Sequence, residues 1–494
     1  MPLPRVHPAP AALAVALTLG VASMTASAAV PQRLAIYSGG FESVSQTRGG
    51  NAQAGYALVQ RPVRLTPGEW SIDDLPLALD PSTVQLSGDG VAVRSQRYDF
   101  ATADHAQLLQ RAVGRTITVE QNLATGVREY TGVLIAAGNG LTLREANGQL
   151  RVLSGYSGFT LAEPPSGLVA RPTLRFLIDA PAARDARLDY ATSGLAWRAE
   201  YRAVLAGSGS ACRMALEGHA MVANRSGVDF NDVALDLVAG EPNRRIDVVQ
   251  VSGTMLRAAA APPEAKMMAD EGAPSVSASG ENHRYTLPGT GDLPDGSLQR
   301  LPLLKAAANV PCERRLVAVR NDGDWMPDRP MIHRELGGDG EIPVRSRLVF
   351  KNDRAAGLGV PLPAGRLRAF DGSELLGEAD IGHTAAGREL DLDLGGAFDV
   401  TAQRKTVDFQ LDRSGRTMTE TVEWTLRNAK AGEATVRLGD RLPRWTEWQL
   451  LEGGERFRKT DAQRIEADVR VPAGGETVLR YTVRYRWAAD ITLD

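Results

Sequence analysis

The sequence has few of the residues from which common reaction centres are built. Two cysteines and six histidines occur in 494 residues, and none falls at the spacing of a zinc site or a C-x-x-C redox motif. The chain also lacks a G-x-S-x-G nucleophile turn, a Walker phosphate loop and an H-E-x-x-H helix. We therefore assign no catalytic residue, no metal ligand and no cofactor from the sequence.

An excess of positive charge is missing as well. The chain has 56 Lys and Arg against 59 Asp and Glu, which gives a formal net charge of −3. A protein that binds nucleic acid needs a basic surface to attract the phosphate backbone. This balance excludes nucleic acid as a partner class.

Long apolar runs are scarce, and the run near the N-terminus, Ala11–Val21, is shorter than the about 20 residues that a membrane-spanning helix needs. It is followed by Ala26-Ser27-Ala28, the small-x-small pattern of a signal-peptidase site. We expect a signal peptide over residues 1–28, cleaved between Ala28 and Ala29, and no transmembrane segment in the mature chain. The expected location is the periplasm or the exterior of the cell. An uncleaved membrane anchor is the alternative for the same segment.

The two cysteines, Cys212 and Cys312, are candidates for a disulfide because an exported chain folds in an oxidising compartment. Such a bond would close a loop of about 100 residues and would remove roughly 4 to 5 kcal/mol of entropy from the unfolded chain. The alternative is a pair of buried free thiols that act as small apolar side chains.

Alternation of apolar and polar residues dominates after residue 30, and this two-residue period is typical of half-buried strands. Near the C-terminus, the apolar face holds Leu479, Tyr481, Val483, Tyr485 and Trp487, and the polar face holds Arg480, Thr482, Arg484 and Arg486. Dense turn residues, 50 Gly and 28 Pro, favour short antiparallel strands. The pattern predicts a mostly β, multidomain protein.

The chain is too long for one hydrophobic core. We expect an N-terminal β region over 30–164, with one short helix near 103–113 and a small bent barrel at about 114–160. A central β domain is expected over 165–398, with a mobile loop at 256–283 that is rich in Ala, Pro, Ser and Gly. The alternating runs of 399–494 predict an immunoglobulin-like sandwich.

Two groups of residues have both a structural and a functional interpretation. Glu389, Asp391 and Asp393 share one face of a predicted strand, where they would either bind calcium or a sugar or, as we favour, meet solvent. Trp445 and Trp448 would point to opposite faces of a strand, so one of them is expected either to cover a core edge or to contact a ligand.

The stretch YATSGLAWRAEY, residues 190–201, carries a more specific signal together with AMVANRSGVDFNDVALDLVAGEPN, residues 220–243. The combined pattern consists of Tyr190, Gly194, Trp197, Tyr201, Asn224 and Gly227. It resembles the bacterial domain-of-unknown-function 4139 family, which includes mucoidy-inhibitor A-like exported proteins. The resemblance implies a mostly β fold and a link to envelope or surface-polysaccharide physiology, with no established catalytic residues.

The alternation after Gly194 places Trp197 and Tyr201 on one face, which we interpret as a core strand rather than the lip of a pocket. We expect the turn at 224–227 to lead into the next strand of the same meandering sheet.

Two functions remain open. The first is a non-catalytic binding or scaffolding protein of the cell envelope, with an envelope protein or a glycan as its partner. The second is a periplasmic glycan or peptide hydrolase whose carboxylates are brought together by the fold.

Overall fold

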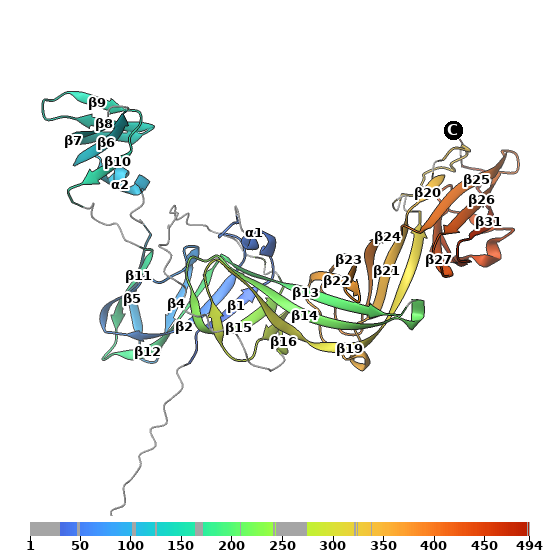
Figure 1. The fold of residues 1–494 in the computed structure, drawn as a ribbon, viewed down its shortest axis with the longest axis horizontal. Helices are drawn as coiled ribbons and strands as arrows, with labels where there is room; N and C mark the ends of the chain where they lie inside the picture. The colour runs from blue at the N-terminus through green and yellow to red at the C-terminus, as the bar shows by residue number, and fades with distance from the viewer. Residues whose placement is uncertain are drawn as a thin grey trace, which may run out of the picture.

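The computed structural model describes residues 30–46, 50–100, 105–123, 126–163, 171–207, 209–240, 243, 274–320, 323, 325–336, 338–491 and 493. Antiparallel sheets make up most of this part of the chain (Figure 1). The expectation of a mostly β, multidomain protein is confirmed. The expected signal peptide lies outside the described residues.

Two sheets form the N-terminal layers of the central region. The larger sheet runs in the order β16-β17-β15-β1-β2-β12-β4, and β18 also pairs with β15. Its strands are β1 (Arg33–Tyr37), β2 (Ala57–Leu65), β4 (Leu79–Ser87), β12 (Arg184–Thr192), β15 (Phe230–Ala239), β16 (Ser275–Ser279), β17 (Asn282–Thr286) and β18 (Gly291–Leu293). The smaller sheet has the order β3-β11-β5, with β3 (Gly68–Ile72), β5 (Ala92–Asp99) and β11 (Thr173–Asp179).

A separate small unit follows β5. It contains α2 (His105–Ala112), β6 (Thr116–Leu123), β7 (Gly126–Gly138), β8 (Gly140–Arg144), β9 (Leu150–Leu153) and β10 (Gly158–Leu161). The strand order is β10-β6-β7-β8-β9, and the helix packs Leu109 and Ala112 against the sheet. Within the described residues the short end strands β9 and β10 do not pair, so this sheet is open rather than a closed barrel.

The long sheet that continues the central region runs β23-β22-β13-β14-β19-β27-β30-β29, and β21 pairs with both β19 and β24. These strands are β13 (Leu195–Ala206), β14 (Arg213–Asn224), β19 (Ser297–Val319), β21 (Val344–Lys351), β22 (Gly365–Asp371), β23 (Glu374–Ile381), β24 (Glu389–Gly396), β27 (Ala434–Arg441), β29 (Arg458–Lys459) and β30 (Arg464–Val471). The 3-10 turns are η1 (Gly209–Ala211), η2 (Arg354–Ala356) and η3 (Gly454–Arg456).

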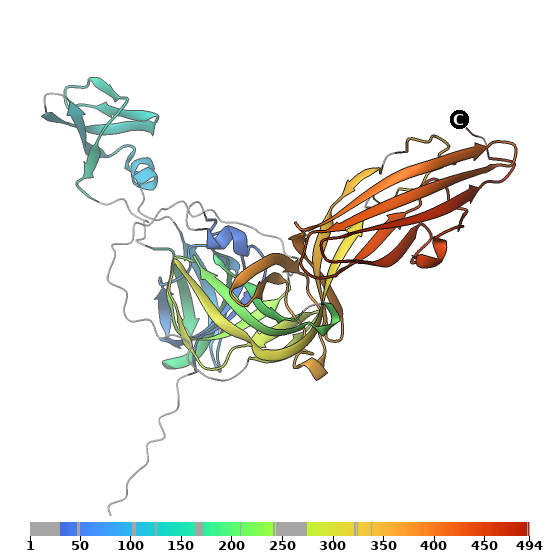
Figure 2. The same cartoon turned by 45° about the vertical axis from the view of Figure 1, so that its right-hand side comes forward.

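The C-terminal sandwich places a second sheet against β27 and β30. Its order is β20-β25-β26-β31-β28, with β20 (Gly340–Ile342), β25 (Val400–Asp412), β26 (Thr417–Asn428), β28 (Trp448–Leu450) and β31 (Glu476–Arg486). Figure 2 shows the long strands of this sandwich running together. Its hydrophobic core also takes in Ala318, Ile332 and Val344, which precede the boundary expected at residue 399.

Strand β19 connects the two large cores. Residues 297–311 pair with β14, whereas residues 312–319 pair with β21 and β27. At about 3.3 Å per residue, its 23 residues reach roughly 75 Å. Pro302 has no N–H to donate to the ladder, and it lies opposite His219, next to a shift in the register. The strand is therefore one continuous element shared by two cores.

The structure corrects three expectations. The sequence predicts one short helix, but the described residues contain a second, α1 (Phe41–Ser45). This helix is too short to leave a periodic signal in the sequence. The loop expected over 256–283 is too long, because β16 and β17 pair as a hairpin and β17 joins β15; residues 256–273 lie outside the described residues. The core of the central region also crosses the boundary expected near residue 165, since Leu34, Leu75 and Trp197 belong to one cluster.

Candidate functional site

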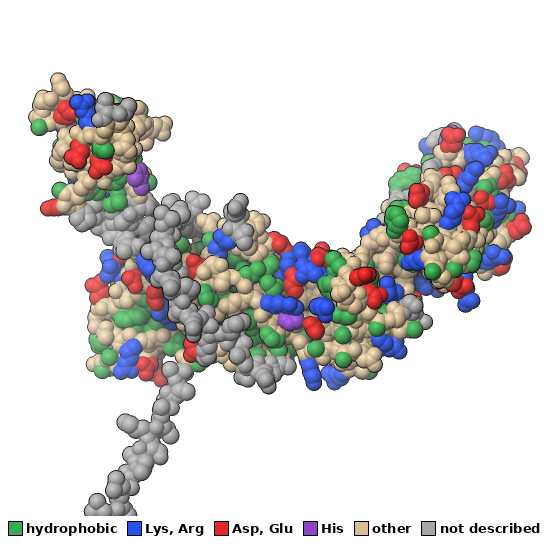
Figure 3. Space-filling model, viewed as in Figure 1, with side chains coloured by type: hydrophobic (Ala, Val, Ile, Leu, Met, Phe, Trp, Pro, Cys, Tyr) green, Lys and Arg blue, Asp and Glu red, His purple; other side chains and the backbone are tan. Residues whose placement is uncertain are grey.

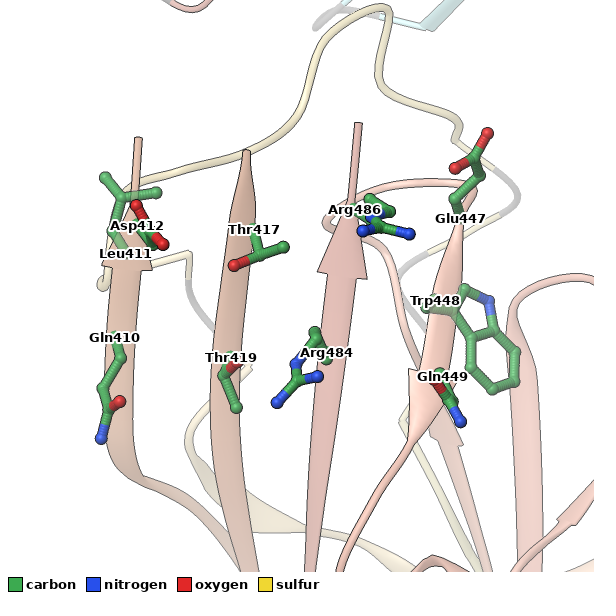
Figure 4. A pocket seen from close by; sticks show the side chains of 10 residues that line it. All are labelled: Gln410, Leu411, Asp412, Thr417, Thr419, Glu447, Trp448, Gln449, Arg484 and Arg486. Carbon is green, nitrogen blue, oxygen red and sulfur yellow. The ribbon is translucent and has the colours of Figure 1, made fainter. Parts of the chain in front are cut away.

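Two rows of polar side chains cross the outer face of the C-terminal sandwich (Figure 4). In one row Asp412 pairs with Thr417 and Thr417 with Arg486, while the backbone N–H of Arg486 donates to the Glu447 carbonyl at 3.1 Å. In the second row Gln410 pairs with Thr419, Thr419 with Arg484, and Arg484 with Gln449. The two-residue period of β25, β26 and β31 turns all of these side chains outward.

The rows line a shallow hollow of about 600 Å³, with Leu411 and Trp448 also in its lining. Trp448 is held by its indole N–H, which donates to the Ala462 carbonyl at 2.7 Å, and by Lys459, whose Nζ lies 4.4 Å from the ring centroid. Among the described residues, no carboxylate lies within ion-pair distance of Arg484 or Arg486. The backbone N–H of Gly415, together with the Ser414 hydroxyl, lowers the pKa of Asp412. The hollow thus offers two guanidinium groups, the carboxylates of Asp412 and Glu447, hydroxyls and amides.

The inward side chains of the same strands hold a buried ionic network. Asp440 is 1 % exposed, and its Oδ2 accepts from Arg404 Nε at 2.8 Å, Tyr481 Oη at 2.8 Å and Trp424 Nε1 at 3.0 Å. Burial is the largest single influence on Arg404 and would lower its pKa. The charges of Asp440, Tyr481 and Glu420, together with the hydrogen bond to Asp440, outweigh burial and raise that pKa. The four side chains therefore form a paired, hydrogen-bonded group within the core.

A second buried pair lies beside the first. Arg444 Nε donates to Glu420 at 2.7 Å, and the Tyr485 hydroxyl donates to the other carboxylate oxygen at 3.0 Å. Arg444 also donates to the carbonyls of Met331, His333 and Arg334, at 3.1, 2.7 and 3.0 Å, which ties that segment to the sandwich. Burial, followed by the charge of Glu420, raises the pKa of Tyr485 well above its usual value.

The chemistry of these acids follows from their partners. Glu420 and Asp440 are buried in the core between the two sheets of the sandwich. Their oxygens accept hydrogen bonds from buried donors, so neither carboxylate faces the hollow. The outer rows present hydrogen-bonding groups at regular strand spacing, about 4.8 Å apart. This arrangement suits the binding of an extended, hydroxyl-rich molecule.

The motif residues near Tyr190 lie in the central core rather than in this hollow. Tyr190, Trp197 and Tyr201 are buried, and burial raises the pKa of both tyrosines. The Trp197 indole donates to the Val238 carbonyl at 3.2 Å, and the Tyr201 hydroxyl donates to the Pro363 carbonyl at 2.7 Å. Gly194 has a φ of 84°, and a Cβ there would come within 2.8 Å of Ser226 Cα.

Asn224 and Gly227 form the corner that leads out of β14. The Asn224 side chain donates to the carbonyls of Val228 and Leu293, at 2.9 and 2.8 Å, and accepts from the Ser226 N–H. Gly227 has a φ of 87° and faces Leu77. The next strand, β15, does not pair with β14 but crosses to the other sheet and runs parallel to β1, so the expected meander is wrong.

A disulfide joins Cys212 to Cys312, with Cα atoms 5.0 Å apart. Cys212 lies where the β13–β14 hairpin enters β14, and Cys312 lies at the point where β19 leaves β14 for β21. The bond therefore fixes the hairpin to the strand that is shared by the two large cores.

The remaining candidate groups have structural partners. Asp391 and Asp393 accept from Arg347 and Arg345 on β21, at 2.7 and 2.9 Å, so this acidic face of β24 forms cross-strand ion pairs. Glu389 is exposed on the same face. Trp445 precedes β28 and Trp448 begins it, so they do not alternate along one strand, and both are half-buried against the sandwich core.

The comparisons with known proteins identify the family. The profile described as Domain of unknown function (DUF4139) matches residues 186–489, which is more than half of the chain. The chain belongs to this family. No curated protein and no solved structure matches the chain. The DUF4139 segment contains the central motif, the disulfide and the two polar rows.

Alternation along β31 predicts that Arg484 and Arg486 lie on a polar strand face, but it does not reveal the two rows. Their neighbours come from three other strands, and alternation along one strand does not say which strands pair. The described residues include no helix with the length and apolarity needed to cross a bilayer.

Proposed function

We propose that this DUF4139 protein is an exported, non-catalytic binding or scaffolding protein of the bacterial cell envelope, linked to surface-polysaccharide physiology as in mucoidy-inhibitor A-like proteins. Its binding surface is the hollow formed by the two polar rows, and its ligand there is an envelope glycan. The proposal does not require a metal or a cofactor.

The proposal that the hollow binds a glycan rests on the arrangement of the two rows. A sugar polymer presents many hydroxyls along an extended chain, and each row offers a series of donors and acceptors across neighbouring strands. Sites for small apolar ligands are instead concave and largely apolar. Arg484 and Arg486, with charges not used by a described carboxylate, supply the strongest donors, since hydrogen bonds to charged groups contribute about 1.5 to 3 kcal/mol.

Two features support export. Residues 1–28 have the composition of a cleavable signal peptide. The Cys212–Cys312 disulfide is the kind of bond that persists in oxidising compartments. Mass spectrometry of the protein recovered from the periplasm is expected to find Ala29 as the N-terminal residue; a chain that retains residues 1–28 in the membrane fraction would overturn the proposed export.

The binding proposal is tested with the mature chain on an array of envelope glycans. The double variant Arg484→Gln/Arg486→Gln should lose at least tenfold in affinity, because two charge-assisted hydrogen bonds are removed. Arg427→Gln is the matched control, since Arg427 lies at the far end of β26, is 65 % exposed, and pairs with Glu476.

Three results would overturn the proposal. The first is a wild-type chain that retains no glycan. The second is equal retention by the double variant, which would remove the rows from the binding site. The third is the release of shortened glycan by the wild-type chain, which would favour a hydrolase.

A further inference from the structure

A second hollow lies on the outer side of the central motif strand, away from the polar rows. It has a volume of about 470 Å³ and lies between α1 and the strands β13, β14, β19 and β22. Figure 3 shows Lys and Arg side chains gathered over the region of β13. The inward face of β13 carries Trp197 and Tyr201, while its outward face carries Arg198, Glu200 and Arg202.

The carboxylates of this hollow are already paired. Glu200 is 8 % exposed and accepts from Arg198 and, at 2.7 Å, from Arg368. Arg198 also donates to Glu42, and Arg368 donates to Glu378 at 2.6 Å. These contacts neutralise Arg198 and Arg368 and hold them in place.

Two further arginines keep their charges unneutralised. The Arg202 guanidinium carbon lies 4.9 Å from the centroid of the Phe370 ring, and Arg300 Nη2 lies 3.0 Å from His219 Nδ1. In the described part of the chain, neither arginine has a carboxylate within ion-pair distance, although Glu217 lies opposite Arg202 in the strand pairing. Burial, and then the charge of Arg300, lowers the pKa of His219, so the ring accepts from Arg300 and adds no charge.

Apart from Ser45 and Tyr201, the rest of the lining is apolar. Phe41, Met221, Leu298 and Phe370 border the two arginines, and the Leu298 side chain is 52 % exposed. Arg300 lies opposite Met221 and donates one N–H to His219, and the remaining N–H groups of its guanidinium match the two oxygens of a carboxylate or phosphate. Apolar walls favour a ligand with an apolar body beside the anionic group.

We propose that this hollow is a binding site for a small molecule with an oxyanion, either a carboxylate or a phosphate, on an apolar body. Arg300 holds the oxyanion, and Phe41, Met221 and Leu298 contact the body. Arg202 lies four residues further along the sheet beside Phe370, where its charge attracts the anion without contacting it. The site is distinct from the polar rows, which lie on the C-terminal sandwich. Its existence does not depend on the glycan proposal.

The test is titration calorimetry of the full mature chain with four probes. Phenyl phosphate and benzoate carry the two oxyanions on an aromatic body, inorganic phosphate carries the anion alone, and benzyl alcohol carries the body alone. Saturable binding is expected for phenyl phosphate, benzoate or both, at least tenfold tighter than for inorganic phosphate or benzyl alcohol. The stronger of the first two probes identifies the preferred oxyanion.

Variants place the binding in this hollow. Arg300→Gln should weaken binding about tenfold, whereas Arg470→Gln, on the exposed face of β30, should leave it unchanged. Arg202→Gln should weaken binding less than Arg300→Gln does. The ring resonances of His219 should shift on binding, because its Nδ1 lies 3.0 Å from Arg300. Thermal melting of each variant shows whether the fold is retained.

Four outcomes would overturn this inference. They are no saturable binding of either aromatic anion, equal binding of benzyl alcohol, unchanged affinity in a folded Arg300→Gln variant, and unchanged His219 resonances at saturation.

Discussion

Arginine has two opposite uses in this protein, and the difference is visible one side chain at a time. Arg404 and Arg444 are 2 % exposed and lie among carboxylates and tyrosines inside the sandwich. Arg202, Arg300, Arg484 and Arg486 line hollows without a described carboxylate partner. The first group fixes the strands, and the second group is available to ligands.

The buried group predicts a large loss of stability when its central acid is removed. Asp440→Ala removes the buried partner of Arg404 and leaves it only the more exposed Asp339, at 2.9 Å, which should cost about 3 to 5 kcal/mol. Asp468→Ala removes a more exposed ion pair with Arg437 and should cost about 0 to 1 kcal/mol. Hydrogen exchange of the amides in β26 and β31 measures the free energy of unfolding of this sandwich. Equal costs for the two variants would contradict the role given to Asp440.

His219 predicts a pH dependence. Its pKa is lowered in the folded chain, mainly by burial and then by Arg300, while Glu217 acts in the opposite direction. The unfolded chain therefore binds the proton more readily, and stability falls as pH drops below about 6.5 toward the folded pKa. His219→Gln should reduce the fall between pH 7.5 and pH 5, as measured by urea unfolding. Identical pH profiles for the two proteins would contradict the lowered pKa.

At the scale of elements, β13 illustrates how one strand combines support and recognition. Its inward face packs Trp197 and Tyr201 into the central core, while its outward face borders the second hollow. Alternation in the sequence predicted the inward face correctly as a core strand. The same alternation did not predict that the outward face of β13 borders a hollow. Residues of α1, β19 and β22 also line this hollow, and the pattern of one strand does not indicate them.

The inward face of β13 gives a direct prediction. Trp197→Ala should destabilise the central region by about 3 to 5 kcal/mol, since a fully packed indole is removed from the core. Trp325→Ala, at a side chain that is 52 % exposed, is the control and should change stability little. Calorimetric melting of the two variants measures the difference. A Trp197→Ala protein that melts like the wild type would contradict the packing assigned to this strand.

The Cys212–Cys312 disulfide links the β13–β14 hairpin to β19. Cys212→Ser/Cys312→Ser releases a loop of 100 residues, and the simple chain-entropy account gives a loss of about 4 to 5 kcal/mol. The oxidised wild type should therefore melt well above both the double variant and the reduced wild type. Melting temperatures that coincide in all three samples would show that the bond adds no stability.

Several elements were predictable from local sequence, and their partners were not. The spacing of Ala106, Leu109 and Val113 indicated α2, and alternation indicated strands such as β24, β26 and β31. The parallel pairing of β1 with β15 joins residues about 200 positions apart, and no local pattern encodes it. Arg404 illustrates the same limit for the site: it occupies an inward position on β25, where its burial depends on Asp440 from a distant strand.

At the scale of the whole molecule, the two hollows lie on different sheets. Strand β19 belongs to the sheet of the central hollow, and its C-terminal end pairs with β27 in the sandwich that carries the other sheet. The polar rows belong to the C-terminal sandwich, while the arginine-lined hollow belongs to the central region. Figure 1 shows β19 running from one region to the other. The two proposals assign one of these surfaces to an extended polar chain and the other to a small anion.

The most direct test of the non-catalytic binding function is the mass of a captured glycan. The mature protein is loaded with a glycan that the polar rows retain and is incubated for many hours. The glycan is then released, and its mass is measured by mass spectrometry. We predict recovery of the intact glycan from the wild type, with little capture by Arg484→Gln/Arg486→Gln. Shortened fragments that appear with the wild type and not with the double variant would show that the same surface cleaves its ligand.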